Sequence, residues 1–332
     1  RNSREYEAIS ENMSEGLVLT DLEGNILTHN KGAEKLFGTG GDINGKNILV
    51  LNRSETFRNV FEEIKNGAQG EGVLELSGRY YSVTVNPVRN ENGGACGAVV
   101  LAVDVTEKEK REKLRREFTA NVSHELKTPL TAVSGISDML KNGMVKPEDV
   151  KGFAEDINRE ASRLISLVND IIKLSELDEG AYDKTDGETD LAEVARDVAK
   201  RIAPVAAGQN VTVKTEGESA VITGSDSLVS EMVYNLCDNA VKYNRPGGSV
   251  TLLTGTKDGK RFVTVKDTGI GIPPEQTDRI FERFYRVDKS RSKQSGGTGL
   301  GLSIVKHIAQ ALGGKITVES RVGEGTEITV TF

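Results

Sequence analysis

The sequence of 332 residues contains no tryptophan, and only 5% of its residues are aromatic. It has no long hydrophobic run, since the longest strongly apolar stretch, Gly97–Val103, is far shorter than the roughly 20 residues that span a bilayer. Its two cysteines, Cys96 and Cys237, lie far apart inside apolar runs. They are expected to be reduced core thiols, which argues against a disulfide framework or a zinc site.

An excess of basic charge is also lacking, because 43 Lys and Arg face 50 Asp and Glu, for a net charge of −7. Such a chain is a poor general binder of nucleic acid, whose phosphates require clustered basic surface. The sequence starts at Arg1 without an initiator methionine or a secretory signal. We therefore expect a cytoplasmic fragment whose membrane anchor lies upstream, and its length predicts two or three domains.

Residues 1–105 are expected to form a small α+β module. Short strands are predicted over 16–20, 25–29, 79–88 and 97–105. Tyr81, Val83 and Val85 alternate with polar residues as in a half-buried strand.

Residues 106–180 have a helical pattern. The charged segment Thr106–Glu117 leads into a helix with one apolar stripe, and a second helix with one such stripe is expected from Pro147 onward. Two one-sided helices cannot bury their stripes as a lone hairpin. We expect an antiparallel hairpin that dimerises into a four-helix bundle.

Residues 181–332 are predicted to form the third domain, after a polar linker over Asp178–Thr189. Strands are predicted near 211–215, 220–223, 249–256, 261–267, 315–319 and 326–331, and helices near 190–203, 225–243 and 298–312. The mixed order of these elements favours a two-layer α/β sandwich over a doubly wound sheet.

Two glycine-rich strings are the first specific signal in this last domain. Asp267–Pro273 follows a predicted strand, and Gly296–Leu302 opens a predicted helix. Glycines at a helix N-terminus let backbone N–H groups approach phosphate. Neither string has dinucleotide-fold spacing, and the P-loop-like Gly40–Lys46 is followed by Asn47 where Ser or Thr would be needed. Each string taken alone is more often a simple turn.

A polar helix face is the second signal. Asn235 and Asn239 are one turn apart, and Lys242 joins the same face. Two amides and a lysine in this pattern could hold magnesium and phosphate oxygens, although a solvated polar face is the equal alternative.

The third signal surrounds His124, which is expected to point into solvent because Val122, Leu126 and Leu130 take the inner stripe. A lone exposed histidine is usually only surface. Here Glu125 could accept a proton from the imidazole and leave a nucleophilic nitrogen. Thr128 shares the face of His124 and could orient a water, and the following proline is expected to bend the helix.

Together and in this order, these motifs resemble those of the sensor histidine kinases of two-component signalling, over nearly the whole chain. The resemblance consists of a phosphoacceptor box at His124, an N box at Asn235–Tyr243, glycine boxes at Asp267–Pro273 and Gly297–Leu302, and an F box at Phe281–Arg286. The first module resembles a PAS domain through Glu15–Leu17, Asp21, Gly24, Asn30 and Asp104–Glu107.

The resemblance implies a Bergerat (GHKL) domain that binds ATP and Mg²⁺. Asp267 would bind the adenine amino group with Thr326 nearby, Asn239 would hold Mg²⁺ beside Asn235, and Thr277–Ser295 would form a lid carrying a basic run from Arg286. The implied ATP-binding residues are Asn235, Asn239, Lys242, Tyr243, Asp267, Gly269, Gly271, Arg286, Gly297, Thr298, Gly299, Leu300, Gly301 and Thr326.

It also implies the reaction and the partners. His124 would take the γ-phosphoryl group with Glu125 as general base, and would pass it to an aspartate of a response-regulator receiver domain. That domain would dock on a homodimer near Thr131, Ala132 and Ile136, and Thr128 would support the reverse, hydrolytic activity. The parent protein would be anchored in a bacterial plasma membrane. The alternatives are a GHKL protein without phosphohistidine chemistry and a pseudokinase scaffold.

Overall fold

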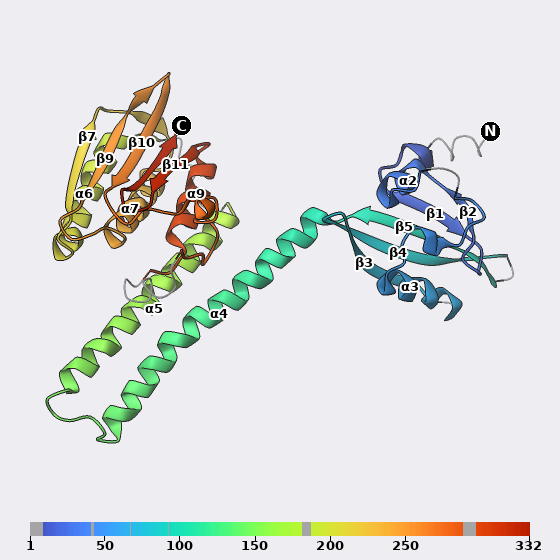
Figure 1. Ribbon diagram of the computed structural model, residues 1–332, viewed down its shortest axis with the longest axis horizontal. Helices are drawn as coiled ribbons and strands as arrows, with labels where there is room; N and C mark the ends of the chain where they lie inside the picture. Colours follow the sequence, from blue (N-terminus) through green and yellow to red (C-terminus); the bar gives the residue numbers. More distant parts are fainter. Residues whose placement is uncertain (1–8, 41–42, 67, 92, 181–186, 288–296) are drawn as a thin grey trace. The chain divides into compact units, whose positions relative to one another are not determined.

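The computed structural model divides the chain into two compact units, residues 1–117 and 118–332 (Figure 1). It describes residues 9–40, 43–66, 68–91, 93–180, 187–287 and 297–332. Among the helices within these ranges, none is both long and apolar enough to cross a bilayer. The first described residues, 9–12, are helical.

The first unit is built on a five-stranded antiparallel sheet with the strand order β2-β1-β5-β4-β3. The strands are β1 (Gly16–Thr20), β2 (Ile26–His29), β3 (Gly70–Leu76), β4 (Arg79–Arg89) and β5 (Ala95–Asp104). The helical segments are α2 (Lys31–Phe37), η1 (Ile48–Val50), α3 (Glu55–Glu62) and η2 (Glu63–Asn66). Strand β3 and helices α2 and α3 were not predicted, because they are short and α2 and β3 are rich in polar residues and glycine.

The side chain of Asn30 holds together the start of this unit. It is 1% exposed and caps helix α2. Its Oδ1 accepts hydrogen bonds from the backbone N–H groups of Leu17 and Ala33, both at 2.9 Å. Its Nδ2 donates to the carbonyl oxygens of Ser10 and Glu15, also at 2.9 Å. A buried amide with all these bonds made fixes the local backbone.

The junction between β5 and helix α4 (Thr106–Lys141) is also fixed by polar contacts. The hydroxyl oxygen of Thr106 accepts a hydrogen bond from the N–H of Tyr80 at 2.9 Å, and the Thr106 N–H donates to Oδ1 of Asp104 at 2.9 Å. Arg79 pairs with Asp104 at 3.3 Å. The first turn of α4 is therefore tied to strand β4.

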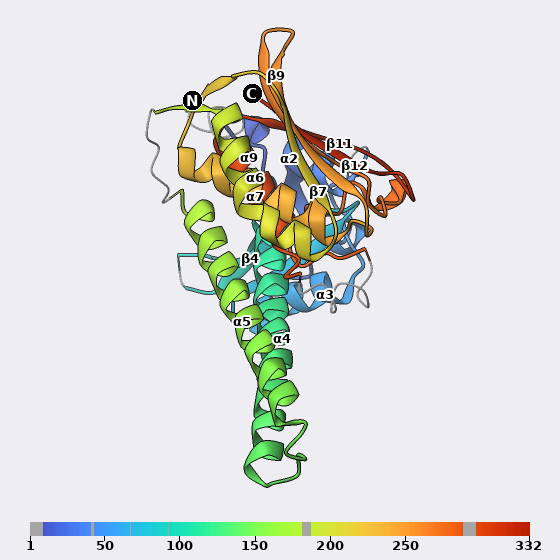
Figure 2. The same ribbon diagram turned by 90° about the vertical axis from the view of Figure 1, so that its left-hand side faces the viewer.

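Helix α4 and helix α5 (Val150–Asp178) run side by side as the predicted antiparallel hairpin (Figure 2). Helix α4 continues through Pro129, and α5 begins at Val150 because residues 147–149 form a turn. Several large apolar side chains of the hairpin are exposed in the single chain. Among them are Leu130, Met139, Ile165, Val168 and Ile172.

The rest of the second unit is a two-layer α/β sandwich, which confirms the predicted fold class. Its sheet has the order β11-β12-β10-β9-β7, in which only the β7–β9 pair is parallel. The strands are β7 (Thr212–Gly217), β9 (Ser249–Lys257), β10 (Lys260–Asp267), β11 (Lys315–Arg321) and β12 (Gly325–Thr331). The helices are α6 (Leu191–Gly208), α7 (Asp226–Lys242), the short η3 (Pro274–Gln276) and α9 (Gly301–Ala311).

One part of the expected linker is strand instead. Strand β6 (Glu188–Asp190) pairs with β8 (Val221–Thr223). Asp190 then caps α6, because its Oδ1 accepts hydrogen bonds from the N–H groups of Ala192 and Ala220, both at 3.0 Å. This cap follows directly after the expected linker, which ended at Thr189.

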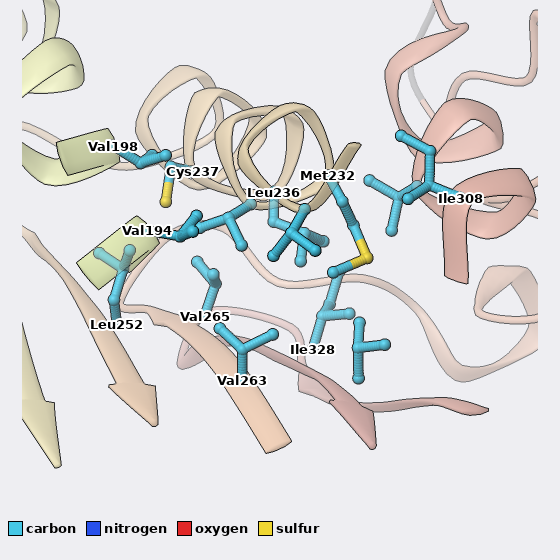
Figure 3. Close-up of a cluster of buried hydrophobic side chains, with 14 of the residues drawn as sticks. Val194, Val198, Met232, Leu236, Cys237, Leu252, Val263, Val265, Ile308 and Ile328 are labelled. Atoms are coloured by element: carbon cyan, nitrogen blue, oxygen red, sulfur yellow. The ribbon is translucent and has the colours of Figure 1, made fainter. Parts of the chain in front are cut away.

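The core of the sandwich lies between the sheet and its helices, where apolar side chains of α7 meet β10 and α9 (Figure 3). The buried residues of α7 recur with helical spacing: Leu228, Val229, Met232, Val233, Leu236, Cys237, Ala240 and Val241. Burial raises the pKa of the Cys237 thiol, as expected for a core cysteine. The same expectation was wrong for Cys96, which is a free cysteine on an exposed position of β5.

Candidate active site

A cavity of about 240 Å³ opens in the second unit beside α7 and both glycine strings. It brings together most of the residues that were predicted to bind a nucleotide. Those that line it are Asn235, Asn239, Lys242, Tyr243, Asp267, Gly271, Arg286, Gly297, Thr298, Gly299, Gly301 and Thr326. Segments more than 80 residues apart in the sequence therefore converge on one site.

Two members of the predicted set, Gly269 and Leu300, are not among the lining residues. The N–H of Gly269 donates a hydrogen bond to Oδ1 of Asp267 at 2.7 Å. Leu300 is fully buried in the core and stands at the N-terminus of α9. Each residue donates a backbone hydrogen bond to a lining residue, Gly269 to Asp267 and Leu300 to Thr298.

Asp267 stands at the end of β10 with its carboxylate on the cavity. Its Oδ1 accepts hydrogen bonds from the N–H of Gly269 at 2.7 Å and from the N–H of Thr326 at 3.2 Å. Burial raises the pKa of Asp267, and these two bonds lower it by less. Because both bonds end on Oδ1, Oδ2 is the oxygen available to a ligand.

The two asparagines of α7 use their N–H donors within the helix. Nδ2 of Asn239 donates to the carbonyl oxygen of Asn235 at 2.9 Å. Nδ2 of Asn235 donates to the carbonyl oxygen and to Oε1 of Glu231, at 2.9 and 3.0 Å. The amide oxygens are thus left for the cavity, and oxygen donors are what Mg²⁺ prefers.

The second glycine string packs closely against its surroundings. Gly299 has a φ of +75°, and a Cβ there would lie 3.0 Å from Cα of Phe284. A Cβ on Gly301 would lie 2.9 Å from Oδ1 of Asn235. Side chains at these positions would close the space between the F box, α7 and the start of α9.

The apolar part of the lining was missed by sequence reasoning. It comprises Leu236, Val265, Ile270, Ile272, Ile280, Val287, Leu302 and Ile328. The alternating isoleucines of the first glycine string were the available signal. An apolar wall beside the Asp267 carboxylate suits a flat, mostly apolar ring that carries a hydrogen-bond donor.

His124 lies on the exposed surface of α4, as predicted, and the hydroxyl of Thr128 donates to its carbonyl oxygen at 3.2 Å. The neighbouring Glu125 contacts two guanidinium groups through Oε2. Nη2 of Arg286 lies at 2.9 Å and Nη2 of Arg163 at 3.4 Å. Since Arg286 also lines the cavity, one side chain links the cavity to the residue next to His124.

The expected lid over Thr277–Ser295 is described only up to residue 287, where it forms turns. Most of the predicted basic run that starts at Arg286 lies outside the described residues. Arg286 itself has a side chain that is 8% exposed, and its buried Nε has no hydrogen-bond partner among the described residues. An unpaired buried donor on a cavity wall suits an anionic ligand.

Three family models match successive parts of the chain. They are the PAS domain over residues 14–107, the His Kinase A (phospho-acceptor) domain over 114–180, and the Histidine kinase-, DNA gyrase B-, and HSP90-like ATPase over 224–332. A sensor module, a phosphoacceptor hairpin and an ATPase module in this order define the class of sensor kinases.

Whole-chain comparisons agree. A sensor protein kinase WalK of Staphylococcus aureus is 34% identical over 338 residues, which cover 99% of this chain and 80% of that protein. The sensor histidine kinase WalK of Bacillus subtilis (strain 168) is 32% identical over 333 residues, which cover 96% of this chain and 54% of that protein. The chain belongs to the family of two-component sensor histidine kinases. It spans about half the length of most of these relatives.

Solved structures extend the likeness to the fold. The histidine kinase ThkA, in a complex with the response regulator protein TrrA, matches with a TM-score of 0.53 and 25% identity over 96% of this chain and 95% of that one. The Acinetobacter baumannii histidine kinase AdeS shares the fold, with a TM-score of 0.53 and 23% identity over 63% of this chain and 96% of that one.

Proposed function

We propose that the chain autophosphorylates His124 from Mg-ATP and passes the phosphoryl group to an aspartate of a response-regulator receiver domain. One observation carries the proposal. Arg286 lines the cavity and contacts Glu125, the residue next to His124. The donor site and the acceptor box therefore meet at one side chain.

The cavity would hold the nucleotide through polar groups on its wall. Oδ2 of Asp267 would accept a hydrogen bond from the adenine amino group, with Thr326 close to it. Lys242 and the N–H groups of the second glycine string would face the phosphates, and Tyr243 would lie beside the base. Arg286 would offer its free Nε–H to the terminal phosphate.

The amide oxygens of Asn239 and Asn235 fit a bound Mg²⁺, because their nitrogens are already used within α7. When bound, the ion would neutralise phosphate charge. Alignment and charge neutralisation are most of what phosphoryl transfer requires from a protein.

In the reaction, an imidazole nitrogen of His124 would attack the γ-phosphorus, and the bond from this phosphorus to the bridging oxygen would break to release ADP. The proton that leaves the imidazole would pass to Glu125. In the described arrangement Glu125 is paired with Arg286 and Arg163, so its carboxylate must exchange at least one of these partners to act as a base.

Partners and setting follow from the same proposal. The exposed apolar side chains of the hairpin would be covered by a second copy of the chain, which gives a four-helix bundle. The receiver domain would dock near Thr131, Ala132 and Ile136, and Thr128 would support hydrolysis of its phosphoaspartate. The site of action would be the bacterial cytoplasm, with attachment to the plasma membrane provided by sequence outside residues 1–332.

Replacement of His124 by Gln tests the assignment. His124→Gln should incorporate no label from γ-labelled ATP, because the acceptor nitrogen is gone, while its affinity for Mg-ADP should be that of the wild type. Label is measured on the denatured chain, and affinity by calorimetry. His29→Gln in the first unit is the control and should keep the label. Label that survives in His124→Gln would contradict the proposal.

The chemical stability of the bound phosphate separates the rival function. Phosphohistidine is labile in acid and stable in alkali, whereas a phosphoserine shows the opposite pattern. A GHKL protein that acts on the hydroxyl of a partner would leave no acid-labile phosphate on this chain.

A further inference from the structure

Helix α5 carries three polar side chains that contact other parts of the second unit. Arg163 reaches Glu125 of α4, Asp170 reaches Thr298 of the second glycine string, and Asp178 reaches Arg283 of the F box at 2.7 Å. Arg163 and Asp170 are seven residues apart, and Asp170 and Asp178 are eight apart, so the three side chains lie along one face of α5. The contacts of Asp170 and Asp178 join α5 to the ATPase module, and that of Arg163 joins it to α4.

Asp170 is half-buried, and it was not predicted as a site residue. It lines the nucleotide cavity together with Ser166, the other α5 residue there. The hydroxyl of Thr298 donates to its Oδ2 at 2.7 Å, and the same hydroxyl oxygen accepts a hydrogen bond from the N–H of Leu300 at 3.2 Å. A chain of hydrogen bonds thus connects the hairpin to the N-terminus of α9.

The charged residues that affect Asp170 also line the cavity. Burial raises its pKa, Thr298 lowers it, and the nearby carboxylates of Glu231 and Asp238 raise it further, while Lys242 acts in the opposite direction. A half-buried carboxylate on a cavity wall needs a reason, because partial desolvation is costly. Its hydrogen bond with the glycine string is the contact that holds it there.

We propose that Asp170 is a positioning residue for autophosphorylation, which holds the glycine string Gly297–Gly301 against the hairpin of the same chain through Thr298. The inference rests on the proposed function and adds to it a residue outside the ATPase module. The nucleotide site is then a composite of the sandwich and α5.

Other contacts between the hairpin and the ATPase module indicate how loss of the Asp170–Thr298 contact should affect autophosphorylation. Arg286, on the cavity wall, touches Glu125 beside His124, so the arrangement that Asp170 stabilises is the one that joins acceptor box and cavity. Loss of the Asp170 contact should lower the rate of transfer within the bound complex. It should affect nucleotide affinity much less, since Asp267 and the α7 amides are untouched.

Two substitutions break the contact from either side. In Asp170→Ala and in Thr298→Val, the rate of His124 labelling at saturating Mg-ATP should fall about tenfold, as expected for loss of a hydrogen bond to a charged group. The KM for ATP should change less than threefold in Asp170→Ala. The double variant should be no slower than the slower single variant, because both substitutions remove the same bond. Thr298→Ser keeps the hydroxyl and should restore the rate.

A matched control separates the contact from a general charge effect on α5. Asp156 is an exposed acid on the same helix, paired only locally with Arg159 in the described structure. Asp156→Ala should label at the rate of the wild type. Hydrogen exchange without nucleotide gives a readout that is independent of activity. The peptide over 297–304 should exchange faster in Asp170→Ala than in the wild type, and at the wild-type rate in Asp156→Ala.

The outcomes separate the two proposals. If the wild type is not labelled on His124, the proposed function fails. If the wild type is labelled but Asp170→Ala is equally fast or faster, or if the effects of Asp170→Ala and Thr298→Val simply multiply, the role of Asp170 is refuted while the function stands. Unchanged exchange over 297–304 would likewise overturn it.

Discussion

Asn30 in the first unit and Asp267 in the second are both polar side chains with little exposure, but they are satisfied in opposite ways. Both polar atoms of the Asn30 amide bond to the surrounding backbone. Asp267 bonds through Oδ1 alone, and burial raises its pKa. A fully paired buried group stabilises its unit, whereas a partly paired one marks where a ligand completes the bonding.

The largest effect should come from removing the charge at the partly paired position. In Asp267→Asn, the amide oxygen keeps the two backbone N–H groups, so the amide nitrogen faces the adenine amino group, donor against donor. Affinity for Mg-ADP should fall at least about 100-fold, because both donors are left unpaired in a desolvated site. Isothermal calorimetry measures this loss.

The same variant should be more stable than the wild type without nucleotide. A carboxyl whose pKa is raised by folding costs stability once it ionises. The penalty is absent below the ordinary value of 3.8 and is complete above the raised pKa. Asp267→Asn should therefore gain in Tm at pH 7 and match the wild type at pH 3. Asp258→Asn, in the exposed β9–β10 turn, is the control. If Asp267→Asn binds Mg-ADP as tightly as the wild type, or has a lower Tm at pH 7, Asp267 is not the ligand-binding position described here.

A smaller effect, in stability alone, is expected at the fully paired position. Asn30→Ala leaves two buried N–H groups and two carbonyls without their partner, which should cost about 2–3 kcal/mol of unfolding free energy. Urea unfolding followed by a probe in the first unit measures this, and Mg-ADP affinity should not change. Asn59→Ala, at an exposed position of α3, should cost nothing. A loss of nucleotide affinity in Asn30→Ala would show that the two positions do not differ as described.

The parts of the site that could be predicted are those that a local pattern encodes. Gly299 and Gly301 are required by close approaches next to a helix start, and Asn235 and Asn239 share a face because of their spacing. His124 was predicted to be exposed, and it is, although Leu130 of the expected inner stripe is also exposed in the single chain. Such signals depend on a few neighbouring residues.

The parts that were missed depend on tertiary packing. Asp170 meets Thr298 across 128 positions, and nothing near it in the sequence indicates a cavity. Cys96 lies in an apolar run, but its exposure depends on which side of β5 faces the core. Residues 188–190 are polar, and only their pairing with β8 makes them a strand.

The proposed function requires that the γ-phosphoryl group of ATP bound in the cavity is transferred to the imidazole of His124. Mapping the residue that carries the phosphoryl group tests this most directly. The wild-type chain is incubated with Mg-ATP, kept in alkali, digested and mapped by mass spectrometry. The account predicts a phosphoryl group on His124 that is lost in acid. A stable phosphoryl group on another residue, or none on a chain that binds Mg-ATP, would contradict it.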